Sequence, residues 1–230
     1  MISAFSFPLV TQAASFGVGS YVNSIPEGNR GTAVSRLAEA GAQWTRLEIG
    51  YSATPDWGPP DDAVSRLRSA GINIILLVGH HDAFSSHDTW KAWVQTLTAK
   101  YAASVQAWEI FNEADNYLSG AAYVDYIKEA HPIIKAANSG ATVIVSGISA
   151  RQQATAFWNG VFDAGAGGSF DALGLHPYRA GAPETKDFNT GNFVDSIKLA
   201  TSSIASHGGG KSVWLTEFGW RNGSVGDADQ

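Results

Sequence analysis

Short apolar runs alternate with helical patterns along the whole chain. Seven runs have the β-branched and aromatic content typical of strands, at residues 16–22, 44–52, 72–80, 105–111, 141–149, 170–178 and 212–220. Before the second, third, fourth, fifth and seventh runs, apolar residues recur at the i, i+3, i+4 spacing of a helix with one buried face. Gly71, Gly140 and the glycines at 208–210 lie where three of these helices should end.

This alternation predicts a parallel sheet covered by helices. Residues 72–79, "INIILLVG", are nearly all apolar, as is typical of a parallel strand buried on both faces. No G-x-G-x-x-G follows the first run and no Walker motif occurs, which disfavours a nucleotide-binding, doubly wound sheet. The predicted fold class is therefore α/β, a (β/α)₈ TIM barrel truncated after strand 7.

The end of the sequence departs from a whole barrel. The chain stops ten residues after Trp220, where a barrel would continue with a helix, an eighth strand and a closing helix. We expect one catalytic barrel domain over residues 1–230 that lacks those last elements. Either the chain is a piece of a longer protein or the barrel is completed in another way. Unpaired edges on the first and seventh strands would then lower its stability.

Composition limits the classes of function. The net charge is −6 and the basic residues are scattered, which argues against a nucleic-acid partner. The absence of cysteine excludes disulfides and thiolate metal sites. The longest apolar run is far shorter than the roughly 20 residues of a membrane span, so no membrane partner is expected. Residues 1–15 lack the basic start of a signal peptide, although a trimmed leader and secretion stay open. Eight Trp and seven Tyr favour flat, amphipathic ligands such as sugars.

Reactive residues of parallel barrels lie where the strands end at their carboxyl side. This rule selects Asn112 and Glu113 after strand four, His176 and Tyr178 after strand six, and Glu217 near the end of strand seven. Two carboxylates at one barrel mouth suit cleavage of an acetal, in which one donates a proton and the other attacks carbon. Neither G-x-S-x-G nor H-E-x-x-H is present.

The same rule sets other charged residues apart. Glu109 precedes Glu113 by four residues, which places it roughly 13 Å lower along an extended strand. We expect Glu109 to have a structural partner. Arg46, on strand two, could reach a site carboxylate or neutralise a buried acid, and the sequence favours neither.

Three motifs carry a resemblance. "WEIFNEAD" at strand four, "LGLHPYR" at strand six and "LTEFGW" at strand seven resemble those of the retaining glycoside hydrolases of the (β/α)₈-barrel clan, which carry catalytic glutamates after strands 4 and 7. The resemblance covers most of the chain in element order, but the specific matches are confined to these motifs. It implies a carbohydrate substrate and neither metal nor organic cofactor.

The resemblance also implies a role for each matching residue. Glu113 would be the general acid and then the general base, and Glu217 the nucleophile that forms a glycosyl-enzyme intermediate. Asn112 would bind the sugar 2-hydroxyl, Tyr178 would hold Glu217 ionised, and His176 would line the floor of the sugar subsite.

Two further residues follow from the same resemblance. Arg46 matches an arginine commonly found near the nucleophile, and Trp220 is a candidate for stacking on a sugar ring. The family's usual aromatic platform, a Trp after strand eight, has no counterpart in this sequence.

Plainer interpretations compete with each role. Glu113 could cap a helix and Glu217 could be a salt-bridged strand end. His176 could be a satisfied structural histidine, and Tyr178 could belong to the core. The segment "GHHDAFSSHD" at 79–88 invites a metal site, but adjacent histidines of an extended segment point in opposite directions. We expect one of them to line the cleft and the others to face water. Trp57 and Tyr51 are stacking candidates or ordinary packing.

The sequence thus predicts a retaining glycoside hydrolase that cleaves β-glycosidic bonds of an oligo- or polysaccharide by double displacement. A carbohydrate-binding barrel without activity, suggested by the missing last unit, is one alternative. A transglycosylase, which would share every named residue, is the other.

Overall fold

The computed structural model describes residues 15–149, 153–179, 181–186 and 191–219. Seven parallel strands form one sheet in chain order, each paired with the next. The strands are β1 (Gly17–Gly19), β2 (Trp44–Glu48), β3 (Asn73–Leu77), β4 (Ala107–Asn112), β5 (Thr142–Ser149), β6 (Ala172–His176) and β7 (Ser212–Leu215). All seven predicted strands are found, and most end earlier than the apolar runs because the sheet gives way to loops at the carboxyl ends.

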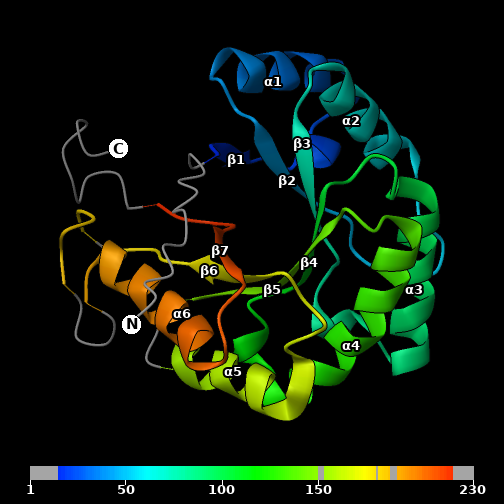
Figure 1. Cartoon of the computed structure of the whole chain (residues 1–230). Coiled ribbons are helices and arrows are strands. Elements are labelled where there is room, and N and C mark those ends of the chain that lie inside the picture. Colours follow the sequence, from blue (N-terminus) through cyan, green and yellow to red (C-terminus); the bar gives the residue numbers. More distant parts are fainter. Residues whose placement is uncertain (1–14, 150–152, 180, 187–190, 220–230) are drawn as a thin grey trace, which may run out of the picture.

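Helices cover the outer face of this sheet (Figure 1). They are α1 (Glu27–Glu39), α2 (Gly58–Ser69), α3 (His87–Tyr101), α4 (Gly120–Ala137), α5 (Ala154–Val161) and α6 (Phe193–Ser206). The five predicted helices are confirmed. Helix α5, between β5 and β6, was not predicted. It is only eight residues long and continues into a π-helical turn at Phe162–Ala166, so its apolar residues form no extended helical period.

Local sequence explains where several helices begin. Ser86 and Ser119 accept a hydrogen bond from the backbone N–H three residues later, at the starts of α3 and α4. Asn192 and Asp195 form a reciprocal capping box at the start of α6. Such caps satisfy N–H groups that the first helical turn leaves unpaired.

The sheet curls so that its two end strands, β1 and β7, lie on the same side of the molecule (Figure 1). Trp44 of β2 and Trp214 of β7 meet edge to face there, with ring centroids 5.0 Å apart. Between β1 and β7, the described residues form no strand pairing. The predicted fold class is confirmed: the strands and helices match a truncated (β/α)₈ barrel.

The buried apolar residues form two groups. The larger fills the space between the sheet and the helices and includes Trp90, Trp108 and Trp158, all with no exposed surface. The smaller group lies inside the curl, near the amino ends of the strands: Ile75, Ala107, Ile144 and Ala172, with Trp44 and Trp214 against them. This inner group forms an apolar layer at the amino ends of the strands, and the polar residues that follow on the same strands lie above it.

Over the described ranges, no helix has the length and apolar character that crossing a bilayer requires.

Candidate active site

The carboxyl end of β4 is bent by two residues with left-handed backbone. Phe111 has φ 63° and Glu113 has φ 45°, a region that few residues other than glycine adopt. Each such residue costs on the order of 1–3 kcal/mol and persists only where its surroundings hold it. Phe111 is fully buried and packs on Trp90 and Tyr126 of α3 and α4, with ring centroids 4.6 and 5.2 Å away.

This bend changes which side chains face the inside of the barrel. In a regular strand, Glu109 and Phe111 would share one face. Here Phe111 packs on the helices, whereas Glu109 and Asn112 both bind Arg46 inside the curl. The expectation that Glu109 lies far below Glu113 assumed an extended strand. The strand is bent between these two residues, so the expected spacing does not apply. The imidazole of His176 lies near both carboxylates, with its nitrogens 3.8 Å from Glu109 and 3.3 Å from Glu113.

Two glycines let the neighbouring strands fit this bend. A Cβ on Gly147 would lie 2.2 Å from His176 Nε2 and 2.6 Å from Glu109 Oε1. A Cβ on Gly174 would lie 2.5 Å from the carbonyl oxygen of Val145. The β5–β6 register shifts between Val145 and Ile148, so β5 carries a bulge here. The bulge supplies the Gly147 carbonyl that accepts from Glu113 N–H at 3.0 Å and the Gly147 N–H that donates to Glu109 at 2.9 Å.

Arg46 joins three groups of the site. Its Nε donates to Glu109 Oε2 at 2.6 Å, and its two terminal nitrogens donate to Glu217 Oε1 at 2.5 Å and Asn112 Oδ1 at 2.8 Å. Arg46 therefore both reaches a site carboxylate, Glu217, and neutralises a buried acid, Glu109. Burial works against charge on Glu109, but Arg46, together with His176, outweighs it and lowers the pKa of Glu109 to about 2. The prediction that Glu109 has a structural partner is confirmed.

Glu217 follows β7, and two side chains hold its carboxyl group. Arg46 contacts one carboxylate oxygen, and the Tyr178 hydroxyl donates to the other at 2.9 Å. Burial, followed by the charge and the hydrogen bond of Glu217, raises the pKa of Tyr178 to about 12, so the phenol keeps its proton. This arrangement holds the Glu217 carboxyl in one orientation.

Within the described residues, Glu113 accepts three side-chain hydrogen bonds. Ser149 Oγ and His176 Nδ1 lie 2.7 and 3.3 Å from Oε1, and Asn116 Nδ2 lies 3.2 Å from Oε2. The hydrogen bond from His176 contributes most, and these donors outweigh partial burial and lower the pKa of Glu113 to about 2. Without substrate, the carboxylate form of Glu113 is therefore favoured.

His176, fully buried at the end of β6, lies among three carboxylates. Its nitrogens are 3.3 Å from Glu113, 3.8 Å from Glu109 and 3.8 Å from Glu217. Burial works to lower the pKa of His176, but the nearby carboxylates of Glu109 and Glu113 outweigh this effect and raise the pKa to about 9. At neutral pH the imidazole is thus a cation that neutralises part of the negative charge.

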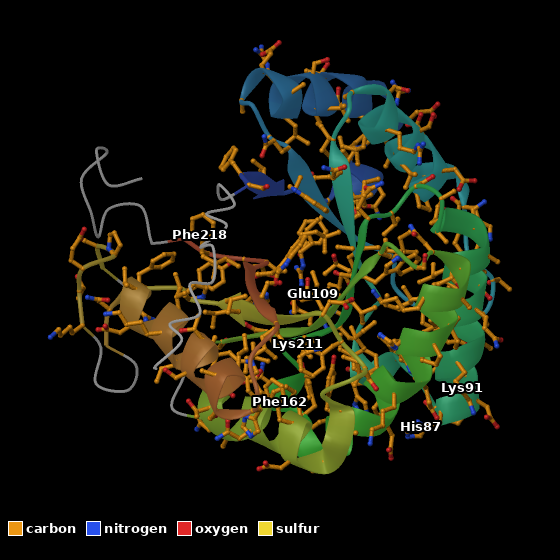
Figure 2. The ribbon with its side chains drawn as sticks, viewed as in Figure 1. His87, Lys91, Glu109, Phe162, Lys211 and Phe218 are labelled. Atoms are coloured by element: carbon orange, nitrogen blue, oxygen red, sulfur yellow. The ribbon has the colours of Figure 1, made fainter. Side chains whose placement is uncertain are left out.

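A hollow of about 140 Å³ opens beside Glu217. It is lined by the last residue of β1 and the two residues after it, by Arg46 of β2, and by one residue from each of the loops after β6 and β7: Gly19, Ser20, Tyr21, Arg46, Tyr178 and Glu217. Figure 2 shows Glu109 inside the curl of the sheet. The hollow is wide enough for part of a small polar ligand and brings it against the Glu217 carboxylate.

The structure gathers most of the predicted site residues at one end of the sheet. Asn112, Glu113, His176, Tyr178 and Glu217 are linked to one another or to Arg46 by hydrogen bonds or charge contacts. Trp220 lies outside the described residues.

The histidine segment after β3 forms no cluster. His80 contacts Glu48 of β2 at 3.1 Å, at the barrel mouth, as expected for one of the three. The expectation that the others face water is wrong in part. His81 packs on Phe111 and bonds Tyr126, and His87 stacks on Tyr126 with 4.3 Å between ring centroids. Within the described ranges, no three His, Cys, Asp or Glu side chains come together as metal ligands would.

The aromatic residues after β2 pack on the helices. Trp57 stacks on Trp93 of α3 with ring centroids 5.8 Å apart, and Tyr51 contacts both Trp93 and Phe84. These contacts favour ordinary packing over sugar stacking for Trp57 and Tyr51.

Comparison with known proteins bears on the fold. No family model matches the chain, and no curated protein matches its sequence. Among solved structures, a family 39 glycoside hydrolase from Bacteroides cellulosilyticus WH2 is 22% identical, with a TM-score of 0.71 over 94% of this chain and 51% of that one. A glucosidase from Croceicoccus marinus is 12% identical, with a TM-score of 0.70 over 89% of this chain and 51% of that one. An endo-1,4-β-mannanase from Rhizomucor miehei is 19% identical, with a TM-score of 0.64 over 89% and 77%.

The chain has the fold of the (β/α)₈-barrel glycoside hydrolases. It spans about half the length of the first two of these structures, 51% in each case. At these identities the likeness concerns the fold, so the function of this glycoside-hydrolase-like barrel is argued from its site.

Sequence reasoning missed several residues of the barrel's site. Ser149 and Asn116 bind Glu113, and Thr216 bridges His176 and Glu109 with distances of 3.0 Å to each. Ser149 is the last residue of β5, so the rule that selected Glu113 could have found it. Gly147 carried no signal, because its importance depends on side chains from β4, β6 and β7 that meet only in the fold.

Proposed function

We propose that this chain is a retaining glycoside hydrolase acting on β-linked oligo- or polysaccharides. Glu217 would be the nucleophile and Glu113 the general acid and then the general base. The observation that carries the proposal is the pair of carboxylates after β4 and β7, which flank the single imidazole of His176 at 3.3 and 3.8 Å. Double displacement needs two such carboxyls beside one bond.

The surroundings of Glu217 support its role. A nucleophilic carboxylate must be ionised and aimed at the anomeric carbon, and both of its oxygens are fixed by Arg46 and Tyr178. The hollow beside it gives a sugar ring access to the carboxylate. Attack on the anomeric carbon would form a glycosyl ester as the leaving oxygen departs.

The surroundings of Glu113 support the second role. Its side chain is 26% exposed, so a bound substrate can reach the carboxyl. After the leaving group departs, the carboxylate form that Ser149, Asn116 and His176 stabilise is suited to activate water as a general base. Asn112 shares Arg46 with Glu217 and is placed to bind a sugar hydroxyl beside the nucleophile.

Azide tests the proposal directly. In Glu217→Ala, hydrolysis of an activated aryl β-glycoside should be abolished, and azide should restore turnover with an inverted glycosyl azide as product. In Glu113→Ala, azide should yield the retained glycosyl azide, because the covalent intermediate still forms. Glu39→Ala, which changes an exposed glutamate on α1, is the matched control and should hydrolyse normally. Wild-type turnover in Glu217→Ala would refute the assignment.

Two other outcomes have their own signatures. Isothermal titration that shows binding of glycan fragments without cleavage, in this chain and in a version extended at its C-terminus, would indicate a carbohydrate-binding barrel. Transfer products at high acceptor concentration would indicate a transglycosylase.

A further inference from the structure

The hydrogen bonds around Glu113 raise a question about its proton. In the described part of the chain, its side-chain partners are Ser149, His176 and Asn116, and all three donate to it. Donors favour the ionised carboxyl. A general acid, however, must carry a proton when the glycosidic bond breaks. The proton for the first step must therefore be stored on a group that can deliver it to Glu113.

Among these three partners, His176 alone has a proton that it can release near neutral pH. The serine hydroxyl and the asparagine amide do not ionise in that range. The His176 ring has no exposed surface, and Nδ1 points to Glu113 Oε1 at 3.3 Å. In the described part of the chain, the other charged groups beside the ring are Glu109 and Glu217, both of which also bind Arg46, and the Tyr178 ring centroid is 6.5 Å away.

The far side of the ring decides which nitrogen can give up its proton. Nε2 lies 3.0 Å from Thr216 Oγ1, and that hydroxyl donates to Glu109 at 3.0 Å. Since the Thr216 hydrogen is used on Glu109, its oxygen accepts from Nε2–H. Arg46 contacts Glu109 at 2.6 Å and keeps it ionised, so Glu109 can only accept. The hydrogen bonds therefore run from His176 to Thr216 and from Thr216 to Glu109. Nε2 therefore keeps its hydrogen, and the hydrogen that can leave is the one on Nδ1.

We propose that His176 stores the catalytic proton and delivers it through Glu113 to the glycosidic oxygen. The inference rests on the proposed hydrolase reaction. The Nδ1–H bond breaks and an O–H bond forms on Glu113 Oε1, which turns a charged pair into a neutral pair. Glu113 then protonates the leaving oxygen as Glu217 bonds to the anomeric carbon. In the second step Glu113 takes a proton from the attacking water and returns it to Nδ1, while Glu217 is released.

Substrate binding supplies a reason for the proton to move. The Glu113 side chain is 26% exposed in the free protein, and a sugar seated against it would exclude that water. Loss of water disfavours the charged pair relative to the neutral one. At 3.3 Å the contact is also longer than the 2.7–2.9 Å typical of strong charge-assisted bonds.

The decisive variant is His176→Asn. The asparagine amide nitrogen takes the place of Nδ1 and can still donate to Glu113, but it has no proton to release. We expect the loss of kcat/KM to be much smaller for a dinitrophenyl glycoside, which needs no acid, than for substrates with poor leaving groups. For alkyl or unsubstituted phenyl glycosides kcat/KM should fall by about 10²- to 10⁴-fold, the usual contribution of general acid catalysis. A loss of equal size across the leaving-group series would show that His176 is only structural and would overturn the proposal.

Two measurements on the native protein keep the test valid if His176→Asn fails to fold. Nitrogen-15 NMR should show His176 as a charged imidazolium at pH 7 that loses its proton near pH 9, in keeping with the raised pKa of His176. With poor leaving groups, activity should fall over the same alkaline range, and in a folded His176→Asn this fall should move to lower pH. A neutral His176 at pH 7 would overturn the proposal.

His87→Asn is the matched control. His87 also contacts a carboxylate, Glu129 at 2.8 Å, but lies on the outer side of the molecule, away from Glu109 (Figure 2). It should leave the leaving-group dependence unchanged. If the wild-type chain cleaves no glycoside at all, the proposed function fails. If the wild type is active but His176→Asn loses the same factor of kcat/KM with every leaving group, only the role of His176 as proton store is refuted.

Discussion

The ends of β4 and β7 each carry one of the two glutamates, but the fold holds them in different ways. Strand β4 is central, and its first five residues are fully buried. Glu113 takes its direction from a bent backbone that packed aromatic rings and a bulge in β5 hold in place. Strand β7 is four residues long, lies at the end of the sheet and is only partly buried. Glu217 is fixed there by the Arg46 and Tyr178 side chains.

The difference shows that two kinds of constraint serve one site. A position in the middle of a sheet can store backbone strain because neighbours on both sides resist relaxation. A position at the end of a sheet has fewer neighbours, so charge-assisted hydrogen bonds must set its geometry. Changes to packing should therefore act mainly through Glu113, and changes to single polar contacts should act mainly through Glu217.

The largest effect is expected where the two ends share a residue. Arg46→Met removes the cation that contacts Glu109, Glu217 and Asn112 and leaves Glu109 buried without its main partner. Breaking a buried ion pair from one side costs about 3–5 kcal/mol. Urea unfolding should show a loss of that size, together with loss of hydrolysis. Arg36→Met, which breaks an exposed pair with Glu39, should cost no more than about 1 kcal/mol. Equal effects would contradict the central position of Arg46.

A packing change should damage the β4 end. In Gly147→Ala the new methyl carbon would overlap His176, Thr216 and Glu109 at 2.2–2.6 Å. Overpacking of this kind costs about 1–3 kcal/mol, and displacement of these groups should also lower kcat. Thermal unfolding and hydrolysis assays would measure both. Gly28→Ala is the control, because a methyl group on this exposed residue of α1 meets nothing within 4 Å. Unchanged activity in Gly147→Ala would show that the bulge does not position the site.

A single polar contact should matter most at the β7 end. Tyr178→Phe removes the hydrogen bond to Glu217 and leaves the ring in place. A hydrogen bond to a charged group contributes about 1.5–3 kcal/mol, so kcat/KM should fall roughly 10- to 100-fold. The melting temperature should hardly change, because Tyr178 is 49% exposed. Tyr117→Phe, at a tyrosine that is 57% exposed after β4, should leave both quantities unchanged. A large drop in melting temperature for Tyr178→Phe would instead point to a packing role.

A change of pH alters charge at both ends without removing any side chain. The folded pKa of His176 is raised to about 9, so its contribution to stability is complete below its unfolded value of about 6.5 and disappears as pH rises through 9. The folded pKa of Glu109 is lowered to about 2, so its contribution is present above its unfolded value of about 4.3 and disappears as pH falls toward 2.

The free energy of unfolding, measured in urea at several pH values, should therefore fall at both ends of the range. His176→Asn should remove the alkaline decline, and it should also weaken the acid decline because His176 helps to lower the pKa of Glu109. If the alkaline decline persists in this variant, another group is responsible for it.

The sequence determined the order of strands and helices, because periods of 2 and 3.6 residues are local properties of a chain. It also placed Glu113, His176 and Glu217 at carboxyl ends of strands, where a parallel barrel gathers its polar residues. Helix α5 was not predicted, because a segment of eight residues is too short to show a clear helical period. The separation of Glu109 from the site was overestimated because the left-handed backbone of Phe111 has no signature in a residue that is not glycine.

Only the tertiary structure decided how the charges are paired. Arg46 meets Glu217 across 171 positions of the chain and Glu109 across 63, and Thr216 meets Glu109 across 107. Nothing local specifies such contacts, since they depend on the curl that brings β2, β4, β6 and β7 around one axis. The sequence thus placed the two carboxylates on the rim, and the fold lowered the pKa of Glu113, because pKa depends on the burial and charge of neighbours from other strands.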